Sequence, residues 1–466
     1  MVMVGSKIKP PNFSKPGPEP VNTVASSTDG ADYIVAQQAA ADALPAAGTP
    51  WLDASRDKAK AILADVGLPT TRLEDWKYTN TRSITRSRFD PVLRSESWSH
   101  TAVIEQLKVP ELNSHRLVFA DGIFEAGLSG AADLPRGVRV MSMAQLLQSE
   151  PEYLKSALGS ALPESPHGFT AMNSSFISDG AFVEIGAEVM LDKPIELLFV
   201  SACSGKDRLG LPRNLVLCRS GSSATVVERY LSATKSRSLT NVVTEVVLDG
   251  GARLNHYRVV DESAHSFHVG GLFAQQDQSS RLGACSVVVG GGLVRNDVLV
   301  NLNAPGAAVD LTGLYLGRGR SHVDNHTHVV HHTPEGTSRE HYKGILDDRS
   351  RAVFHGRITV GSGAQQTDSE QSNQNLLLSR DAEVDTKPQL EIYADDVKCA
   401  HGVTVGQLDE NAVFYLRARG VGEDEARKML TLAFAADVLA KIELPALKGY
   451  LEHCVSDLLL SVSHTS

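Results

Sequence analysis

The sequence predicts a mainly β protein in which a β-solenoid core stands between two helical regions. From residue 166 to about residue 405, short β-like runs follow one another, separated by Gly, Asn, Asp and Ser, and no amphipathic helix interrupts them. A doubly wound sheet would need a helix of roughly 10–15 residues between its parallel strands, so that fold is disfavoured. A solenoid, a sandwich or a barrel fits the pattern.

A loose internal repeat favours the solenoid among these three folds. A small or polar turn residue followed by a short strand recurs about every 30 residues at first and then at about half that spacing. Each such unit exposes an apolar face that only a stacked neighbour covers. A β-sandwich is the alternative, and the pattern does not reveal the handedness of the crossovers. The turns are placed at Gly221, Gly250, Gly306, Gly336, Arg349, Gly363 and Arg380.

Two segments precede the predicted core. Residues 1–50 are rich in Pro, Ala, Ser and Gly and carry few large apolar side chains to offset the entropy lost on ordering, so we expect a mostly disordered tail. Within it, a short helix is expected from about residue 31 to residue 44, where Pro45 stops it. Residues 51–165 are expected to form a helix-rich region of mixed character.

Residues 406–466 are expected to form a C-terminal helical domain. Apolar residues recur there at helical spacing in three segments, at about 411–419, 423–442 and 445–461. The pattern leaves two roles open for these helices. They either cap the exposed last strands of the solenoid or dock a partner protein.

Composition limits the partners and the compartment. A net charge of −10 argues against nucleic-acid binding, and no apolar run is long enough to cross a membrane. The five cysteines are widely separated and form no CxxC pair, which favours free thiols in a reducing compartment. The first fifty residues contain no Arg and several acids, unlike a typical plastid transit peptide. A cytoplasmic location is therefore expected.

A His-rich segment is the first candidate metal site. If it is a strand, His322, His326 and His328 share one face with Asp324, and three imidazoles with a carboxylate suit zinc or iron. The alternatives are a stand-alone β-helix metalloenzyme that uses these histidines and a merely polar ladder on the solenoid face. The sequence contains no P-loop and no GxSxG nucleophile elbow, so any ATP hydrolysis must come from another protein.

The segment around Cys399 and His401 is the second candidate. If residues 397–401 are extended, Cys399 and His401 point to the same face, and a thiolate beside an imidazole suits iron, zinc or copper. Two ligands do not complete a metal site, so the missing ligands would come from another chain. The alternative is a buried cysteine beside a hydrogen-bonded histidine, with no metal.

Three motifs show a resemblance to a known family. They are Arg72-Leu-Glu-Asp-Trp-Lys-Tyr-Thr-Asn80, Phe354-His-Gly-Arg-Ile358, and Pro388-Gln-Leu-Glu-Ile-Tyr393 followed by Lys398-Cys-Ala-His-Gly-Val-Thr-Val-Gly406. Together they resemble the SufB/SufD family of the SUF iron–sulfur cluster assembly system, and within it the SufD type. The resemblance runs from about Trp51 onward and includes the His-rich segment, which lowers the weight of an independent metal site there.

The resemblance implies a right-handed parallel β-helix with an N-terminal helical region and a C-terminal helical domain. It implies pairing with a SufB-like homologue through the β-helix ends and docking of a SufC-like ATPase on the C-terminal helices. His401, with Cys399 beside it, would then stand at the SufB–SufD junction. SufB-like chains carry Glu-Ala after the corresponding His, whereas this sequence has Gly402-Val403, as SufD does.

The expected function is that of a non-enzymatic scaffold for iron–sulfur cluster assembly. The isolated chain is expected to hold no stable cofactor, and iron or a nascent cluster would bind transiently in the complex, with further ligands from the partner. Anchors for the ATPase are expected on the helix at 423–442, where Met429, Leu430 and Phe434 are the candidate contact residues. A purely structural subunit without ligands of its own is a further alternative.

Overall fold

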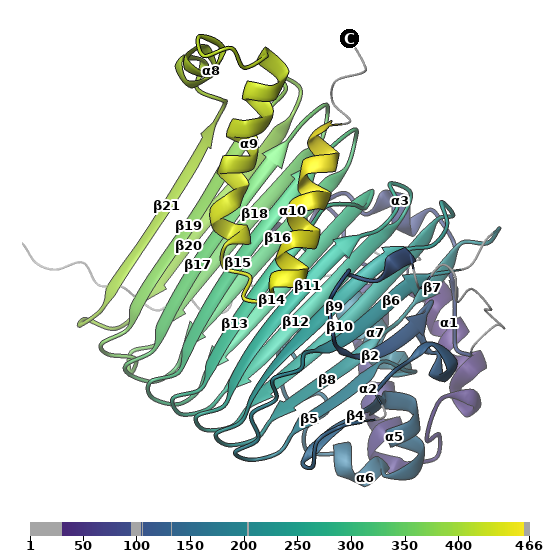
Figure 1. The fold of residues 1–466 in the computed structure, drawn as a ribbon. Coiled ribbons are helices and arrows are strands. Elements are labelled where there is room, and N and C mark those ends of the chain that lie inside the picture. The colour runs from purple at the N-terminus through teal and green to yellow at the C-terminus, as the bar shows by residue number, and fades with distance from the viewer. Residues whose placement is uncertain (1–29, 95–103, 105, 132, 203–204, 461–466) are drawn as a thin grey trace, which may run out of the picture.

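The computed structural model describes residues 30–94, 104, 106–131, 133–202 and 205–460. Its core is a parallel β-solenoid, in which the chain coils repeatedly and each coil adds one strand to each of two sheets (Figure 1). The predicted mainly β fold with helices at both ends is confirmed. The sandwich alternative is wrong, because successive strands of each sheet run parallel.

The first sheet has eleven strands, and all but one of its pairings are parallel. Its outermost strand at the C-terminal end is β20. In sheet order the strands are β20 (Glu383–Ile392), β18 (Arg351–Val360), β16 (His322–His331), β14 (Leu293–Leu302), β12 (Phe267–Gln276), β10 (Ser238–Leu248), β8 (Arg213–Cys218), β5 (Ala181–Ile185) and β4 (Val138–Ser142), with β7 (Arg208–Gly210) beside β10 and β1 (Asp90–Pro91) beside β7.

The second sheet has ten strands and lies opposite the first across the core. Its outermost strand at the C-terminal end is β21. In sheet order the strands are β21 (Lys398–Gly406), β19 (Asp368–Leu377), β17 (Thr337–Leu346), β15 (Ala308–Gly317), β13 (Arg281–Val288), β11 (Arg253–Asp261), β9 (Ser223–Ser232), β6 (Ile195–Ser201), β2 (His115–Ala120) and β3 (Ile123–Phe124).

The length of a coil explains the repeat in the sequence. Phe267 pairs with Leu293, and Arg351 pairs with Glu383, so partners in neighbouring coils are 26 and 32 residues apart. Each coil contains two turns, which is why predicted turn residues fall at both the full and the half spacing. At one corner the backbone is left-handed, as at Gly306 with φ 71°, a conformation that favours glycine.

The core consists of rows of apolar side chains that stack from coil to coil. One such row runs through Val246, Ala274, Val300, Val329 and Ile358, which pair in register and are fully buried. Because side chains alternate across a strand, every second residue of each coil enters this interior. Burial of one such Val or Ile side chain stabilises the fold by about 1.5–3 kcal/mol.

Helices and short strands close the N-terminal end of the solenoid. The antiparallel strands β3 and β4 end the two sheets, and α2, α5 and α6 pack against the outer side of β5 and β8. The helices of this region are α1 (Ala31–Ala40), η2 (Ala41–Ala43), α2 (Pro50–Val66), η3 (Glu74–Trp76), α3 (Arg82–Thr85), η4 (Ala126–Leu128), α5 (Met143–Ser149), α6 (Pro151–Leu154) and α7 (Gly168–Phe176).

Two sequence expectations need correction here. The segment predicted as a tail is ordered from residue 30, with Tyr33 and Leu44 buried among apolar side chains, and the short helix expected near residue 31 is present as α1. Residues 1–29 of that tail lie outside the described residues. A helix, α7, also opens the region predicted to be purely β. All nine of its residues are buried, so it lacks the polar face that identifies an amphipathic helix.

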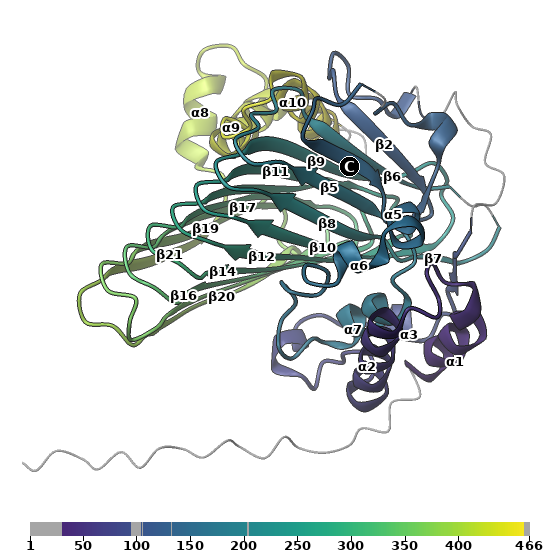
Figure 2. The ribbon, with the colours of Figure 1, turned by 90° about the horizontal axis from the view of Figure 1, so that it is seen from below.

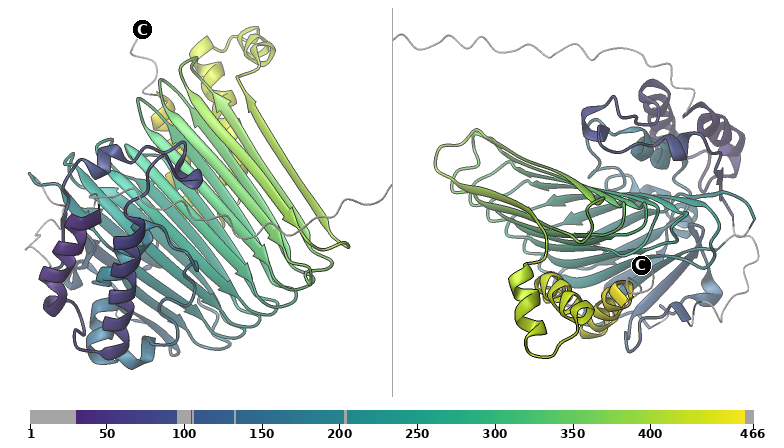
Figure 3. Two further views of the ribbon diagram at one scale, coloured as in Figure 1. Left: turned by 180° about the vertical axis from the view of Figure 1, so that it is seen from behind. Right: turned by 90° about the horizontal axis from the view of Figure 1, so that it is seen from above.

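The C-terminal helices lie on the outer face of the ten-stranded sheet. They are α8 (Glu410–Arg417), α9 (Glu423–Leu439) and α10 (Pro445–Leu460), close to the predicted bounds. Val438 of α9 and Leu451 of α10 are buried in one apolar cluster with Leu314 and Ile345 of the sheet. Figures 2 and 3 show these helices on one face of the solenoid and α1, α2 and α7 on the opposite face. The helices therefore do not cap the last coil.

The last coil leaves the C-terminal end of the solenoid open. Within the part of the chain that the structure describes, neither β20 nor β21 has a neighbouring strand on its outer side (Figure 1). Ile392, Tyr393 and Val405 are exposed at this end, and 67% of Tyr393 is accessible. We call this surface, formed by β20, β21 and the connecting residues 393–397, the open end.

Two observations bear on the environment of the chain. Cys218, Cys285, Cys399 and Cys454 are free thiols, and Cys203 lies outside the described residues. Among the described helices, none combines the length and the apolar character needed to cross a lipid bilayer.

Candidate functional site

The structure places Cys399 and His401 on β21, the last strand of the open end. They pair in register with Ser369 and Gln371 of β19, both of which are buried and face the solenoid interior. Cys399 is half-buried and packs against Ile358 and Val360. His401 is exposed, since no other strand of the described residues stacks over it. The two side chains thus share the inward face of a strand whose outer edge is free.

The thiol of Cys399 is not activated in the isolated chain. Burial raises the pKa of this thiol above its ordinary value, and the nearby carboxylate of Asp368 raises it further. The thiol is therefore protonated at neutral pH, and a thiolate forms only when a metal ion or a positive group arrives.

Polar side chains continue inward from both residues. Behind Cys399, Ser369 Oγ lies 2.8 Å from Ser338 Oγ, which lies 3.0 Å from His331 Nε2. Behind His401, Gln371 Nε2 donates to Glu340 Oε2 at 3.2 Å. The row behind Cys399 is apolar in the preceding coils, at Leu254, Leu282 and Val309, and becomes polar at Ser338 and Ser369.

Glu340 is the unusual member of this polar interior. It is fully buried and accepts hydrogen bonds from Thr327 and Gln371, and burial raises the pKa of Glu340 to about 7. Sequence reasoning missed this residue. The sequence did contain an indication of a polar interior. Polar residues such as Gln371, Asn373 and Asn375 stand at the alternate strand positions where apolar core residues are expected.

The three histidines of the His-rich segment share the outer face of β16, as the strand pattern predicted, but they contact different partners. His322 Nε2 lies 2.8 Å from Thr79 Oγ1, and His328 Nε2 lies 3.0 Å from Thr359 Oγ1. His326 instead lies beside His355 of β18 and Asp75 of the N-terminal region. Of the three, only His326 belongs to a group of potential metal ligands among the described residues.

The predicted partner residues on α9 face different surroundings. Met429 is 45% exposed, and Leu430 is half-buried. Phe434 packs against the solenoid, where Lys343 Nζ lies 4.5 Å from its ring centroid. Two aromatic residues of α8 were not predicted: Phe414 is 70% exposed and Tyr415 is also exposed. Two adjacent aromatic residues in a short helix cannot both face its narrow apolar side, and this could have indicated that one is exposed.

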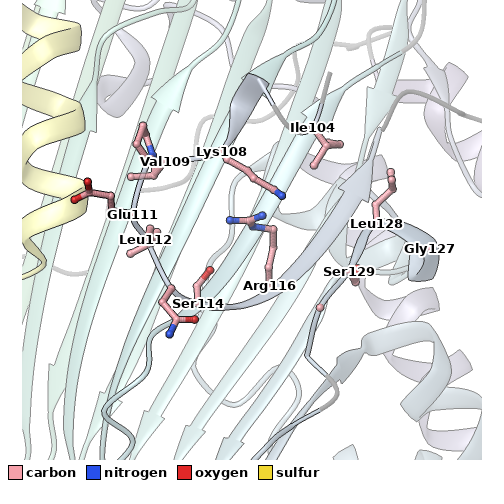
Figure 4. A pocket seen from close by; sticks show the side chains of 13 residues that line it. Ile104, Lys108, Val109, Glu111, Leu112, Ser114, Arg116, Gly127, Leu128 and Ser129 are labelled. Atoms are coloured by element: carbon pink, nitrogen blue, oxygen red, sulfur yellow. The ribbon is translucent and has the colours of Figure 1, made fainter. Parts of the chain in front are cut away.

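A surface pocket of about 630 Å³ lies near β2 and η4, at the opposite end of the solenoid from β21 (Figures 1 and 4). Lys108 and Arg116 line it, but Arg116 Nε is already paired with the buried Glu196 at 2.7 Å. This pocket therefore contributes nothing to the Cys399–His401 site.

Comparison with known proteins identifies the family. Residues 201–434 match the sequence model described as "SUF system FeS cluster assembly, SufBD core domain", and residues 28–197 match "SufBD protein N-terminal region". The chain belongs to the SufB/SufD family. The core-domain match contains β20, β21 and both Cys399 and His401, so the open end is part of the family's common core.

Relatives match the chain over most of its length. The iron–sulfur cluster assembly SufBD family protein of Synechocystis is 32% identical over 86% of this chain and 90% of its own length. The iron–sulfur cluster assembly protein SufD of Escherichia coli is 30% identical, over 83% of this chain and 88% of its own length. The chloroplastic protein ABCI7 of Arabidopsis thaliana is also 30% identical, over 86% and 84%.

Proposed function

We propose that this SufB/SufD-family chain is a SufD-like scaffold subunit of a SufB–SufC–SufD complex. It pairs with a SufB-like homologue through its open end, and Cys399 and His401 contribute ligands to iron or a nascent iron–sulfur cluster at that junction. The observation that carries the proposal is the position of Cys399 and His401, side by side on one face of the edge strand β21.

The open end has the properties of a pairing surface. The outer edges of β20 and β21 present backbone N–H and C=O groups that a second solenoid can satisfy by continuing both sheets. The exposed Tyr393 and Val405 would lose water on pairing. A homologous partner suits this surface best, because its strands have the same spacing and direction.

The chemistry of the pair favours completion by a partner. A thiolate and an imidazole suit iron in protein sites, but two ligands leave most of the coordination sphere open. Because the pKa of Cys399 is raised, the thiol must lose its proton as the ion binds, which weakens binding by the isolated chain. Ligands and charge from a SufB-like subunit would offset this cost. At the open end, the isolated chain then holds no stable iron or cluster.

The C-terminal helices supply the second proposed interface. The exposed side of these helices carries Phe414 and Tyr415 of α8 and Met429 of α9, whereas Ala435 and Val438 of α9 pack on the solenoid. A SufC-like ATPase would dock on this exposed side and provide the ATP hydrolysis for which this chain lacks a P-loop. The chain itself then acts as a scaffold in the cytoplasm and not as an enzyme.

Cluster delivery by the reconstituted complex tests the proposal. The chain is co-expressed with SufB-like and SufC-like partners, and transfer of the cluster to an apo-acceptor is measured for wild type and for His401→Ala. We expect the complex to assemble normally and delivery to be strongly reduced. Thr404→Ala is the matched control, because Thr404 lies on the outward side of the same strand. Delivery at the wild-type rate by His401→Ala would leave only a structural role.

A further inference from the structure

A second group of potential metal ligands lies on the outer face of the eleven-stranded sheet, away from the open-end ligand pair. It forms where the N-terminal segment with η3 crosses strands β16, β18 and β20 (Figure 3). His326, His355 and Lys387 pair in register across these strands. The pocket between the segment and the sheet measures about 50 Å³, and Asp75, Asp324, His326 and His355 are among the residues that line it.

Asp75, His326 and His355 form the ligand group. Each offers one ligand atom, and these atoms all lie within 4.8 Å of one another. The two imidazole centroids are 4.8 Å apart, and Asp75 Oδ1 lies 4.0 Å from His355 Nδ1. Two imidazoles and a carboxylate suit Zn²⁺ or Fe²⁺. The Asp75 side chain is 67% exposed, so it is free to move the short distance that coordination requires.

An oxygen acceptor lies near the Nε2 atom of each imidazole. His326 Nε2 lies 3.1 Å from Asp324 Oδ1, and His355 Nε2 lies 3.5 Å from Gln389 Oε1. Asp324 is buried and held in place by Arg295 Nη1 at 2.6 Å. The other ring nitrogen of His355, Nδ1, lies 4.0 Å from Asp75 Oδ1 and so faces the ligand group. Metal-binding histidines typically show this arrangement, in which a carboxylate or amide fixes the ring orientation.

The surrounding charge attracts a cation. Carboxylates of Glu74, Asp75 and Asp385 line the pocket, whereas Lys387 is the cation beside them and is paired with Glu74 at 2.8 Å.

The two sequence motifs that the open end does not use meet in this pocket. Asp75 belongs to the Arg72–Asn80 motif, and His355 belongs to the Phe354–Ile358 motif. We propose that Asp75, His326 and His355 bind one divalent transition-metal ion of the Zn²⁺ or Fe²⁺ class. The ion would fasten the N-terminal segment to the outer face of the solenoid. This site is separate from Cys399 and His401 and does not depend on the proposed function.

Metal titration of the full chain tests the site. The chain is stripped with a chelator and titrated with Zn²⁺ by calorimetry and with Co²⁺ by absorption spectroscopy. We expect about one equivalent to bind, and we expect Asp75→Asn and His326→Ala to weaken binding at least about tenfold. His332→Ala is the matched control, since this exposed histidine follows the same strand and contacts Asn301 instead. The absence of saturable binding, or equal affinity in all variants, would overturn the proposal.

Two further variants make the test specific. Repeating the titration with His401→Ala must leave the affinity unchanged, because loss of binding there would assign the ion to the open end and refute this site. Lys387→Met removes the ammonium group beside the pocket and should tighten Zn²⁺ binding several-fold. Unchanged or weaker binding would contradict the assigned position of the ion. Zn²⁺ should also raise the Tm of wild type but not that of Asp75→Asn.

Discussion

At the scale of single residues, the interior near the open end contains a buried carboxyl group, Glu340, with no ion pair among the described residues. Glu228, farther from that end, is instead paired with Arg258 at 2.9 Å. Glu340 occupies a row that continues from Leu311 to Gln371 and His401. Its Oε1 atom and the Oε1 atom of Gln371 have no hydrogen-bond partner among the described residues. A buried carboxyl group in this state is stable only when protonated, which makes the fold sensitive to pH.

Glu340 therefore predicts the direction in which stability changes with pH. Its pKa is about 7 in the folded chain against an ordinary value of 4.5, so its protonated form favours folding. The contribution of Glu340 to the free energy of unfolding is complete below about pH 4.5. It decreases as the pH rises toward 7, by about 3 kcal/mol in total. Glu340→Gln should remove this loss, because its amide can donate to Gln371 Oε1. Urea unfolding at pH 5 and pH 8 measures the difference.

The control for this prediction is Glu370→Gln, which changes an exposed carboxylate on the neighbouring strand β19. It should leave the pH profile of stability unaltered. If Glu340→Gln is no more stable than wild type at pH 8, the carboxyl group is not held in the raised-pKa state described here.

At the scale of elements, the predictable features were those with a local signal. Strands such as β10 and β11 were predictable because β-branched residues recur between turn residues. The helix α7 was not, because burial on all sides removes the polar stripe that marks a surface helix. The place where α9 and α10 pack was also not predictable, since an apolar stripe does not say which surface covers it.

The packing of α10 gives a prediction about stability. Leu451 is fully buried between α10 and the outer face of the ten-stranded sheet, so Leu451→Ala should reduce the free energy of unfolding by about 2–5 kcal/mol. Met429→Ala, at an exposed position of α9, should change it by less than about 0.5 kcal/mol. Chemical unfolding followed by circular dichroism measures both. Similar values for the two variants would contradict the observed packing of the helices.

The exposed aromatics of α8 give a prediction about docking. Phe414→Ser removes an apolar side chain that contributes nothing to the core, so the stability of the chain should not change. We expect the affinity of the Phe414→Ser chain for a SufC-like ATPase, measured by calorimetry, to fall at least about tenfold, because an anchor of the interface is lost. Tight binding by Phe414→Ser would place the ATPase elsewhere.

At the scale of the whole molecule, the two ends of the solenoid differ. The first end is closed by antiparallel strands and helices, whereas the last is bounded by two free edge strands. The sequence predicted that Cys399 and His401 share one face, because side chains two residues apart on a strand point to the same side. It did not predict that the C-terminal helices leave the end uncovered, because that depends on contacts distant in sequence.

If the open end is the pairing surface, a charged substitution on its last strand should block pairing. Val405→Lys places a charge at the exposed end of β21, where a partner sheet would have to desolvate it. The isolated chain should fold normally, and association with a SufB-like partner in gel filtration should be lost. Thr404→Lys, on the outward side of the same strand, is the control and should still associate. Equal association by both variants would argue against end-to-end pairing.

Hydrogen exchange of the chain with and without a SufB-like partner tests the central claim most directly. The account predicts that backbone amides of residues 383–392 and 398–406, which form β20 and β21, exchange more slowly in the complex. Protection confined to other regions, with these two strands unchanged, would contradict a junction at the open end.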